Sequence, residues 1–186
     1  MEKIAAIVEG HTEEHFVKKT YGAVRVSRGI PNGRTVSTEV IVEAVLDALE
    51  LVSGDVTKVI ILFDREGRTQ TAAELAEAVR SGISDRCGNR ALYIGVSDRQ
   101  IENWILADIE TMRSLYDPSF NYPGDGVSAK SLLKRLNNGV SLGPTDTAIL
   151  LKSCSAIRGA AVSESLSDFL RQIDFHWYWA RGGGSN

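Results

Sequence analysis

Two short apolar runs in this chain each end directly in acidic residues. The run at residues 4–8 leads into Glu9, and the run at residues 59–63 leads into Asp64 and Glu66. Both runs have the length of a buried β-strand, and helical patterns separate such runs along the chain. Strands that alternate with helices form a largely parallel sheet, and the carboxyl ends of such strands are where ligands bind. We therefore expect an α/β fold with acidic groups gathered at one edge of the sheet.

The remaining patterns predict a four-stranded, mostly parallel sheet flanked by helices, with a helical extension at the C-terminal end. Thr12, Thr71 with Glu74, and Ser97 with Gln100 are expected to cap helices. The expected strands are residues 3–8, 23–28, 57–63 and 90–96, and the expected helices include residues 38–52, 71–80, 128–136, 145–151 and 164–173. The expected organisation is a metal-binding core at 1–110, a helical extension packed on the same domain at 111–180, and a flexible tail at 181–186.

Composition excludes several classes of protein. The chain has 186 residues, 43% of them hydrophobic, and a net charge of −3, which is ordinary for a globular domain. Its apolar runs are too short to span a bilayer, and no secretory signal pattern opens the sequence, so we expect a cytoplasmic protein without a membrane partner. Cys87 and Cys154 make neither a disulfide framework nor a zinc site.

The acidic residues at the strand ends predict a metal site. Asp64 and Glu66 are two positions apart, which in extended backbone puts both carboxylates on one side and Arg65 on the other. Asp98 and Glu102 are four apart at an expected helix start and would share one face. Carboxylates crowded at one edge need a cation, and oxygen ligands suit magnesium, with manganese as the substitute.

Some of these acids have structural explanations as well. Glu13 and Glu14 fall in a first helical turn, where the helix dipole favours negative charge. Asp98 has a second interpretation as a helix cap. Asp108 and Glu110 diverge on an expected helix and are discounted as joint ligands.

A basic stretch between residues 16 and 38 contains no acidic residue. It is interpreted either as a phosphate-binding surface beside the metal or as a solvated basic loop. The residues expected to bind nucleic acid are Lys18, Lys19, Arg25, Arg28 and Arg34.

The aromatic segment at residues 175–179 has two interpretations, as a packed terminal segment or as a surface that stacks nucleic-acid bases. His11 lies in the motif loop and could contact substrate. His15 and His176 are weaker candidates, and none of the three has metal-ligand spacing.

The series Glu9-Gly10-x-Thr12-Glu13 after the first strand, followed by Asp64-x-Glu66 after a later strand, resembles the Toprim domain. That domain is shared by topoisomerases, bacterial primases, the overcoming-lysogenisation-defect nucleases and small stand-alone proteins. With the segment at residues 102–108, the chain looks most similar to the nuclease and stand-alone branch, and the resemblance covers residues 3–108. The family pattern is Asp-x-Asp, whereas this chain has Asp64-x-Glu66. The second carboxylate side chain is therefore one methylene longer.

The resemblance implies a metal-dependent phosphodiesterase. It implies that Glu9, Glu13, Asp64, Glu66 and Glu102 bind Mg²⁺ or Mn²⁺, with Glu9 and Asp64 as catalytic groups and Glu9 as a proton carrier. The nuclease branch also uses a late lysine for the scissile phosphate, and Lys152 is the candidate here. It further implies DNA or RNA as substrate, a role as a defence effector against phage or as a toxin, and a partner protein such as an ATPase.

Three alternatives to a nuclease remain open. A receiver-like signalling module would use Asp64 as phosphoacceptor, with Ser97 as its hydroxyl residue. A non-catalytic protein of the same fold would bind nucleic acid or metal without turnover. A magnesium-dependent phosphatase with Asp64 as nucleophile is a weaker alternative, because its aspartate pair would follow the first strand.

Overall fold

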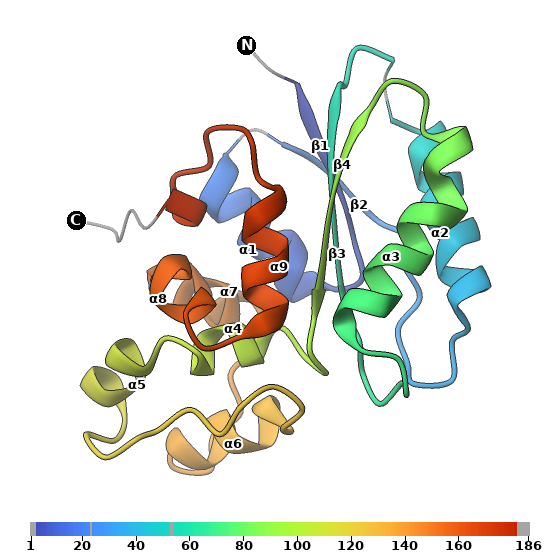
Figure 1. Ribbon diagram of the computed structural model, residues 1–186. Helices are drawn as coiled ribbons and strands as arrows, with labels where there is room; N and C mark the ends of the chain where they lie inside the picture. Colours follow the sequence, from blue (N-terminus) through green and yellow to red (C-terminus); the bar gives the residue numbers. More distant parts are fainter. Residues whose placement is uncertain (1–2, 23, 53, 182–186) are drawn as a thin grey trace.

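A four-stranded parallel sheet forms the centre of the protein, with helices on both faces (Figure 1). The computed structural model describes residues 3–22, 24–52 and 54–181. The strands are β1 (Ile4–Val8), β2 (Arg25–Arg28), β3 (Lys58–Asp64) and β4 (Ala91–Ser97), in the spatial order β2-β1-β3-β4. This confirms the expected fold class. Because all strands run in the same direction, their carboxyl ends share one edge.

The connections and the C-terminal half are helical, as the sequence predicts. The α-helices are α1 (His11–Tyr21), α2 (Thr38–Glu50), α3 (Ala72–Ile83), α4 (Glu102–Leu106), α5 (Ile109–Leu115), α6 (Ala129–Leu136), α7 (Pro144–Ser153), α8 (Ala156–Ala160) and α9 (Glu164–Gln172). Short 3₁₀ turns occur at Ser84–Arg86 and Trp179–Arg181. Two expected positions, Ala23 in the second strand and the tail at 182–186, lie outside the described residues.

Side-chain alternation along β3 explains how the two faces are covered. Val59, Ile61 and Phe63 pack with α2 and α3, whereas Ile60 and Leu62 pack on the opposite face, with α1 and the C-terminal helices. Since successive side chains in a strand point to opposite faces, Asp64 follows Leu62 onto the α1 side. That side of the sheet edge holds the candidate site.

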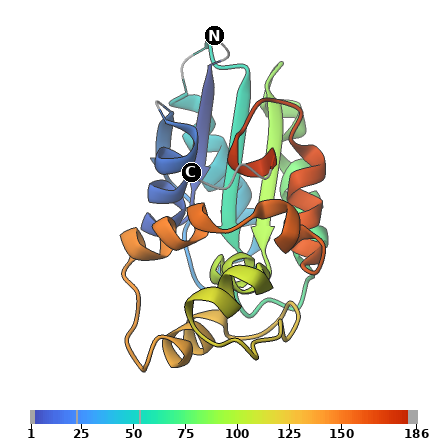
Figure 2. The same ribbon diagram turned by 90° about the vertical axis from the view of Figure 1, so that its left-hand side faces the viewer.

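The C-terminal helices complete the core on the α1 side of the sheet (Figure 2). Helix α9 packs directly on β4, and Gly95 permits this approach: a Cβ there would lie 2.9 Å from a ring carbon of Phe169. The aromatic segment is packed rather than free to stack on bases, because Phe175, Trp177 and Trp179 are all buried. Residues 111–180 therefore contribute to the same hydrophobic core as the strands.

Of the three helix caps expected from sequence, one is present and two are not. Thr71 and Glu74 form the reciprocal capping box that their spacing predicts at α3. The expected cap at Thr12 is wrong, because α1 begins at His11 with Gly10 as its N-cap. The expected pairing of Ser97 with Gln100 is also wrong, because Ser97 ends β4 and its hydroxyl is hydrogen bonded across the sheet edge.

No helix in the described part of the chain is both long enough and apolar enough to cross a membrane.

Candidate metal centre

The turns after β3 and β4 are hydrogen bonded to each other, and this holds Asp64 in place. The Ser97 hydroxyl donates to Asp64 Oδ1 at 2.6 Å, the Arg65 N–H donates to the Ser97 carbonyl at 2.9 Å, and the Glu66 N–H donates to the Arg99 carbonyl at 2.9 Å. Glu66 and Arg99 both have left-handed backbone, with φ of 58° and 62°. Side-chain-bearing residues seldom adopt this conformation, which often marks functional sites.

The expectation of extended backbone through residues 64–66 is therefore wrong, since Glu66 lies in a turn. Its carboxylate still belongs to the acidic group, because it interacts electrostatically with both Glu9 and Glu102. Arg65 does point away from these acids, as expected, and pairs with Asp98.

Glu9 connects the end of β1 to the end of β3. Its Oε2 atom accepts the Asp64 backbone N–H at 2.6 Å. Burial raises the pKa of Glu9 to about 7; the hydrogen bond from Asp64 opposes the rise, and the charges of Glu13 and Glu66 add to it. A carboxyl group that titrates near neutral pH can accept or release a proton under ordinary conditions.

Glu13 reaches the same edge from the first turn of α1. The backbone N–H groups of Glu13 and Gly10 lower its pKa, which indicates that the side chain folds back over the helix start. Burial, followed by the charge of Glu102, raises its pKa against those hydrogen bonds. Gly10 leaves room for this arrangement, since a Cβ there would lie 2.8 Å from Glu13 Oε2. The helix-dipole explanation and the site assignment thus apply to Glu13 together.

Asp64 is at the centre of the acidic group. Its side chain is buried, with the residue 5% exposed, and burial raises its pKa well above the usual range. The charges of Glu13, Glu9 and Glu102 raise it further, while the hydrogen bond from Ser97 lowers it. One strand end, with Glu9, and two helix starts, with Glu13 and Glu102, therefore bring negative charge to Asp64.

Glu102 is the first residue of α4 and is 4% exposed. Its Oε2 atom is buried and has no hydrogen-bond partner, while Oε1 lies 3.9 Å from Lys130 Nζ. Burial raises the pKa of Glu102, and the charge of Lys130 lowers it. The expected shared face of Asp98 and Glu102 does not form, because Asp98 precedes the helix and binds Arg65 instead.

The five residues assigned to metal binding thus interact electrostatically with one another at a single edge. Over residues 3–22, 24–52 and 54–181, however, no three histidine, cysteine, aspartate or glutamate side chains are arranged so that they could hold a metal ion. The oxygen-only donor set and the unpartnered Glu102 oxygen fit a divalent cation such as magnesium. Binding would therefore require side chains of the acidic group to turn toward the ion.

Lys130 on α6 is a cation that faces four of the five carboxylates. Its ammonium interacts with Glu102, Asp64, Glu13 and Glu66, which together raise its pKa against the opposing effect of burial. Lys152, the lysine chosen from sequence, lies exposed in the last turn of α7. Nothing in the sequence near Lys130 marks it, because only the docking of α6 against α4 brings it to the site.

All five basic residues assigned to nucleic-acid binding are exposed: Lys18, Lys19, Arg25, Arg28 and Arg34. Three of these residues lie toward the amino ends of the strands, and the other two lie at the carboxyl ends. Lys18 and Lys19 are in the last turn of α1 and Arg25 opens β2, so these three lie toward the amino ends of the strands. Arg28 ends β2 and binds Glu14 at 2.7 Å, and Arg34 lies over Gly67 in the turn after β3.

The histidines lie outside the acidic group. His11 is exposed, lies 2.8 Å from Arg28 (Nε2 to Nη1) and stacks with His15. His176 is exposed within the packed aromatic segment. Within the part of the chain that the structure describes, His11 therefore lies next to Arg28, without a contact to the acidic group.

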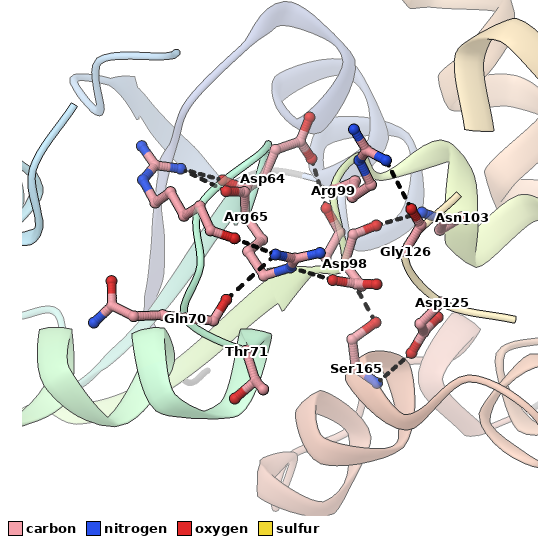
Figure 3. A network of polar contacts seen from close by, with 12 residues as sticks. Asp64, Arg65, Gln70, Thr71, Asp98, Arg99, Asn103, Asp125, Gly126 and Ser165 are labelled. Carbon is pink, nitrogen blue, oxygen red and sulfur yellow. Dashed lines mark hydrogen bonds and ion pairs between the residues drawn. The ribbon is translucent and has the colours of Figure 1, made fainter. Parts of the chain in front are cut away.

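Two arginines that the sequence did not single out support the site. Arg65 binds Asp98 and the carbonyls of Arg68 and Gln70, beside a cavity of about 390 Å³ that extends to Ser165 (Figure 3). Arg68 donates to the carbonyls of Asp64 and Arg65 and, across the site, to those of Gly33 and Val36. Arg68 thereby joins the loop that carries Arg34 to the turn that carries Glu66.

No curated protein and no solved structure matches this chain. One family model does match, over residues 8–142, which include every carboxylate of the acidic group as well as Lys130. The chain therefore belongs to the family described as Domain of unknown function (DUF4276).

Proposed function

We propose that this protein is a magnesium-dependent nuclease that hydrolyses phosphodiester bonds of DNA or RNA. The observation that carries the proposal is the convergence of Glu9, Glu13, Asp64, Glu66 and Glu102 at the carboxyl ends of three parallel strands. Three of these carboxylates, Glu13, Asp64 and Glu102, are buried, which is unfavourable for folding. Raised carboxyl pKa values such as those of Glu9 and Asp64 are typical of functional sites.

The five carboxylates would hold the divalent ion, as the resemblance of the sequence motifs to the Toprim domain implies. A bound magnesium ion supplies a water of lowered pKa and neutralises negative charge on the leaving oxygen. The chain itself provides the rest of the chemistry. Glu9 can take up a proton near neutral pH, and the N–H of Asp64 keeps its carboxylate directed to the strand end.

Substrate would approach over the edge that carries Arg28 and Arg34. Both side chains are exposed, and Arg34 is joined to the site through the Arg68 hydrogen bonds. Their positive charge suits the phosphate backbone of nucleic acid. A defence role and an ATPase partner belong to the same proposal and rest on the resemblance alone, and the cytoplasmic location rests on the sequence patterns described above.

One contact favours the receiver-like alternative, namely the hydrogen bond from Ser97 to Asp64. Burial of Asp64 argues against it, because a phosphoacceptor must be reached by its phosphodonor. In addition, within the described residues no fifth strand follows β4.

The test is cleavage of supercoiled plasmid, single-stranded DNA and bulk transfer RNA with magnesium or manganese. We expect metal-dependent cleavage of at least one substrate, lost in Asp64→Asn, which keeps the size of the side chain and removes its charge. Lys152→Met measures whether the lysine chosen from sequence contributes. Cleavage by Asp64→Asn at the wild-type rate would refute the assignment. Metal binding without cleavage of any substrate would favour the non-catalytic alternative.

A further inference from the structure

The acidic group lies beside a cation of the chain itself, the ammonium of Lys130. It lies 3.9 Å from Glu102 Oε1 and interacts with Asp64, Glu13 and Glu66. Those four residues are four of the five carboxylates assigned to the metal. Lys130 and a divalent ion would therefore interact with the same negative charge.

The contact between Lys130 and Glu102 is an ion pair without a close hydrogen bond. At 3.9 Å the two atoms exceed hydrogen-bond distance, and Glu102 Oε2 has no partner although it is buried. A buried carboxylate oxygen normally has a partner, so this atom is available to a ligand. Lys130 compensates the charge of the group without saturating its oxygen atoms.

The backbone of α6 is tied to the loop after β4, while the Lys130 side chain is half-exposed and borders open space. The Lys130 N–H donates to Gln100 Oε1 at 3.1 Å, which ties the helix start to the loop after β4. The Lys130 side chain is 55% exposed and borders a cavity of about 120 Å³, lined also by Lys134, Ser141 and Thr147. The ammonium can therefore leave the carboxylates without any movement of the helix.

We propose that Lys130 is the internal counter-ion of the metal-free site and that a divalent cation displaces its ammonium from the carboxylates. Lys130 is thus a positioning residue that sets the affinity for metal. It also accounts for the finding that, among the described residues, no three of these side chains form a ready-made set of metal ligands: four of the carboxylates interact with one monovalent ammonium instead. The proposal rests on the metal-binding part of the proposed function and is independent of cleavage.

The experiment compares Lys130→Met with wild-type protein and with Lys134→Met, a matched change one turn later on the same helix. Calorimetric titration with Mn²⁺ measures affinity, and urea unfolding in EDTA measures the stability of the metal-free protein. Without an ammonium to displace, Lys130→Met should bind Mn²⁺ at least about fivefold more tightly than wild type. Lys134→Met should remain within about twofold of wild type. Lys130→Met should also unfold at lower urea concentration in EDTA, because its carboxylates lose their counter-ion.

Equal Mn²⁺ affinities for wild type and Lys130→Met would overturn the proposal and leave the nuclease assignment standing. Equal tightening in both variants would also overturn it, since a general effect of surface charge would explain the result. Absence of Mn²⁺ binding by wild-type protein would overturn both this proposal and the metal-dependent function. Tighter binding in Lys130→Met alone, with no cleavage of nucleic acid, would support the counter-ion and refute only the nuclease.

Discussion

Glu9→Gln should make the metal-free protein more stable at alkaline pH. The change removes a charge and keeps an oxygen that can accept the Asp64 N–H. In the folded protein the pKa of Glu9 is raised from 4.5 to about 7, chiefly by burial. The folded state therefore favours the protonated carboxyl, and wild-type stability falls as the pH rises through this interval.

The size of the change in stability follows from the difference between the Glu9 pKa of 4.5 and its raised value of about 7. One pKa unit corresponds to about 1.4 kcal/mol, so ionised Glu9 lowers the free energy of unfolding by about 3 kcal/mol at pH 8. At pH 5 most of this cost is absent, because the carboxyl of the folded protein remains protonated. Glutamine does not titrate, so the stability difference between variant and wild type should grow by about 2–3 kcal/mol from pH 5 to pH 8.

The assay is urea unfolding in EDTA at pH 5, 6, 7 and 8, for wild type, Glu9→Gln and the control Glu50→Gln. Glu50 is exposed at the end of α2, and its substitution should give a difference that varies little with pH. A Glu9→Gln difference that is constant across this range would refute the argument from burial. With magnesium in excess the order should reverse at pH 8, because wild type gains a bound ion and the variant lacks one ligand.

Two further predictions concern the packing that supports the site. Gly95→Ala should lower the free energy of unfolding by about 1–3 kcal/mol, since the new methyl group would lie 2.6 Å from Leu62 Cδ2 and 2.9 Å from a ring carbon of Phe169. Urea unfolding at wild-type stability would show that both side chains can move away freely. Arg158→Ala should lower it by about 2–3 kcal/mol, because Asp108 is fully buried and loses both bonds to the guanidinium at 2.8 Å. Adding Asp108→Asn should recover part of that loss, and no recovery would contradict the explanation by an unpaired charge.

Structural features that depend on residues close together in the sequence could be predicted from the sequence. The strand patterns placed β1, β3 and β4 to within about two residues of their observed ends. The box formed by Thr71 and Glu74 is present because both partners lie within one helical turn. The carboxylates that directly follow β1 and β3 reach the same edge because parallel strands share a direction.

Two helix caps predicted from local sequence do not form, because tertiary contacts involve the same residues or their neighbours. Ser97 has the spacing of a capping residue, but Asp64 is a closer partner for its hydroxyl, and α4 begins five residues later at Glu102. Thr12 could cap a helix, yet the Glu13 carboxylate covers the first N–H groups and the helix starts earlier. In both places a carboxylate of the acidic group, Asp64 or Glu13, also displaced the local prediction.

The sequence by itself determined the strand-then-carboxylate pattern, and with it the class of fold and the position of the acidic edge. Only the tertiary structure decided which cation faces that edge. Lys130 is 28 positions beyond Glu102 and reaches it through the docking of α6, whereas Lys152 lies exposed on α7. The physical reason is that strand patterns arise from hydrophobic burial along one segment, while charge pairing depends on distances between segments that the pattern does not specify.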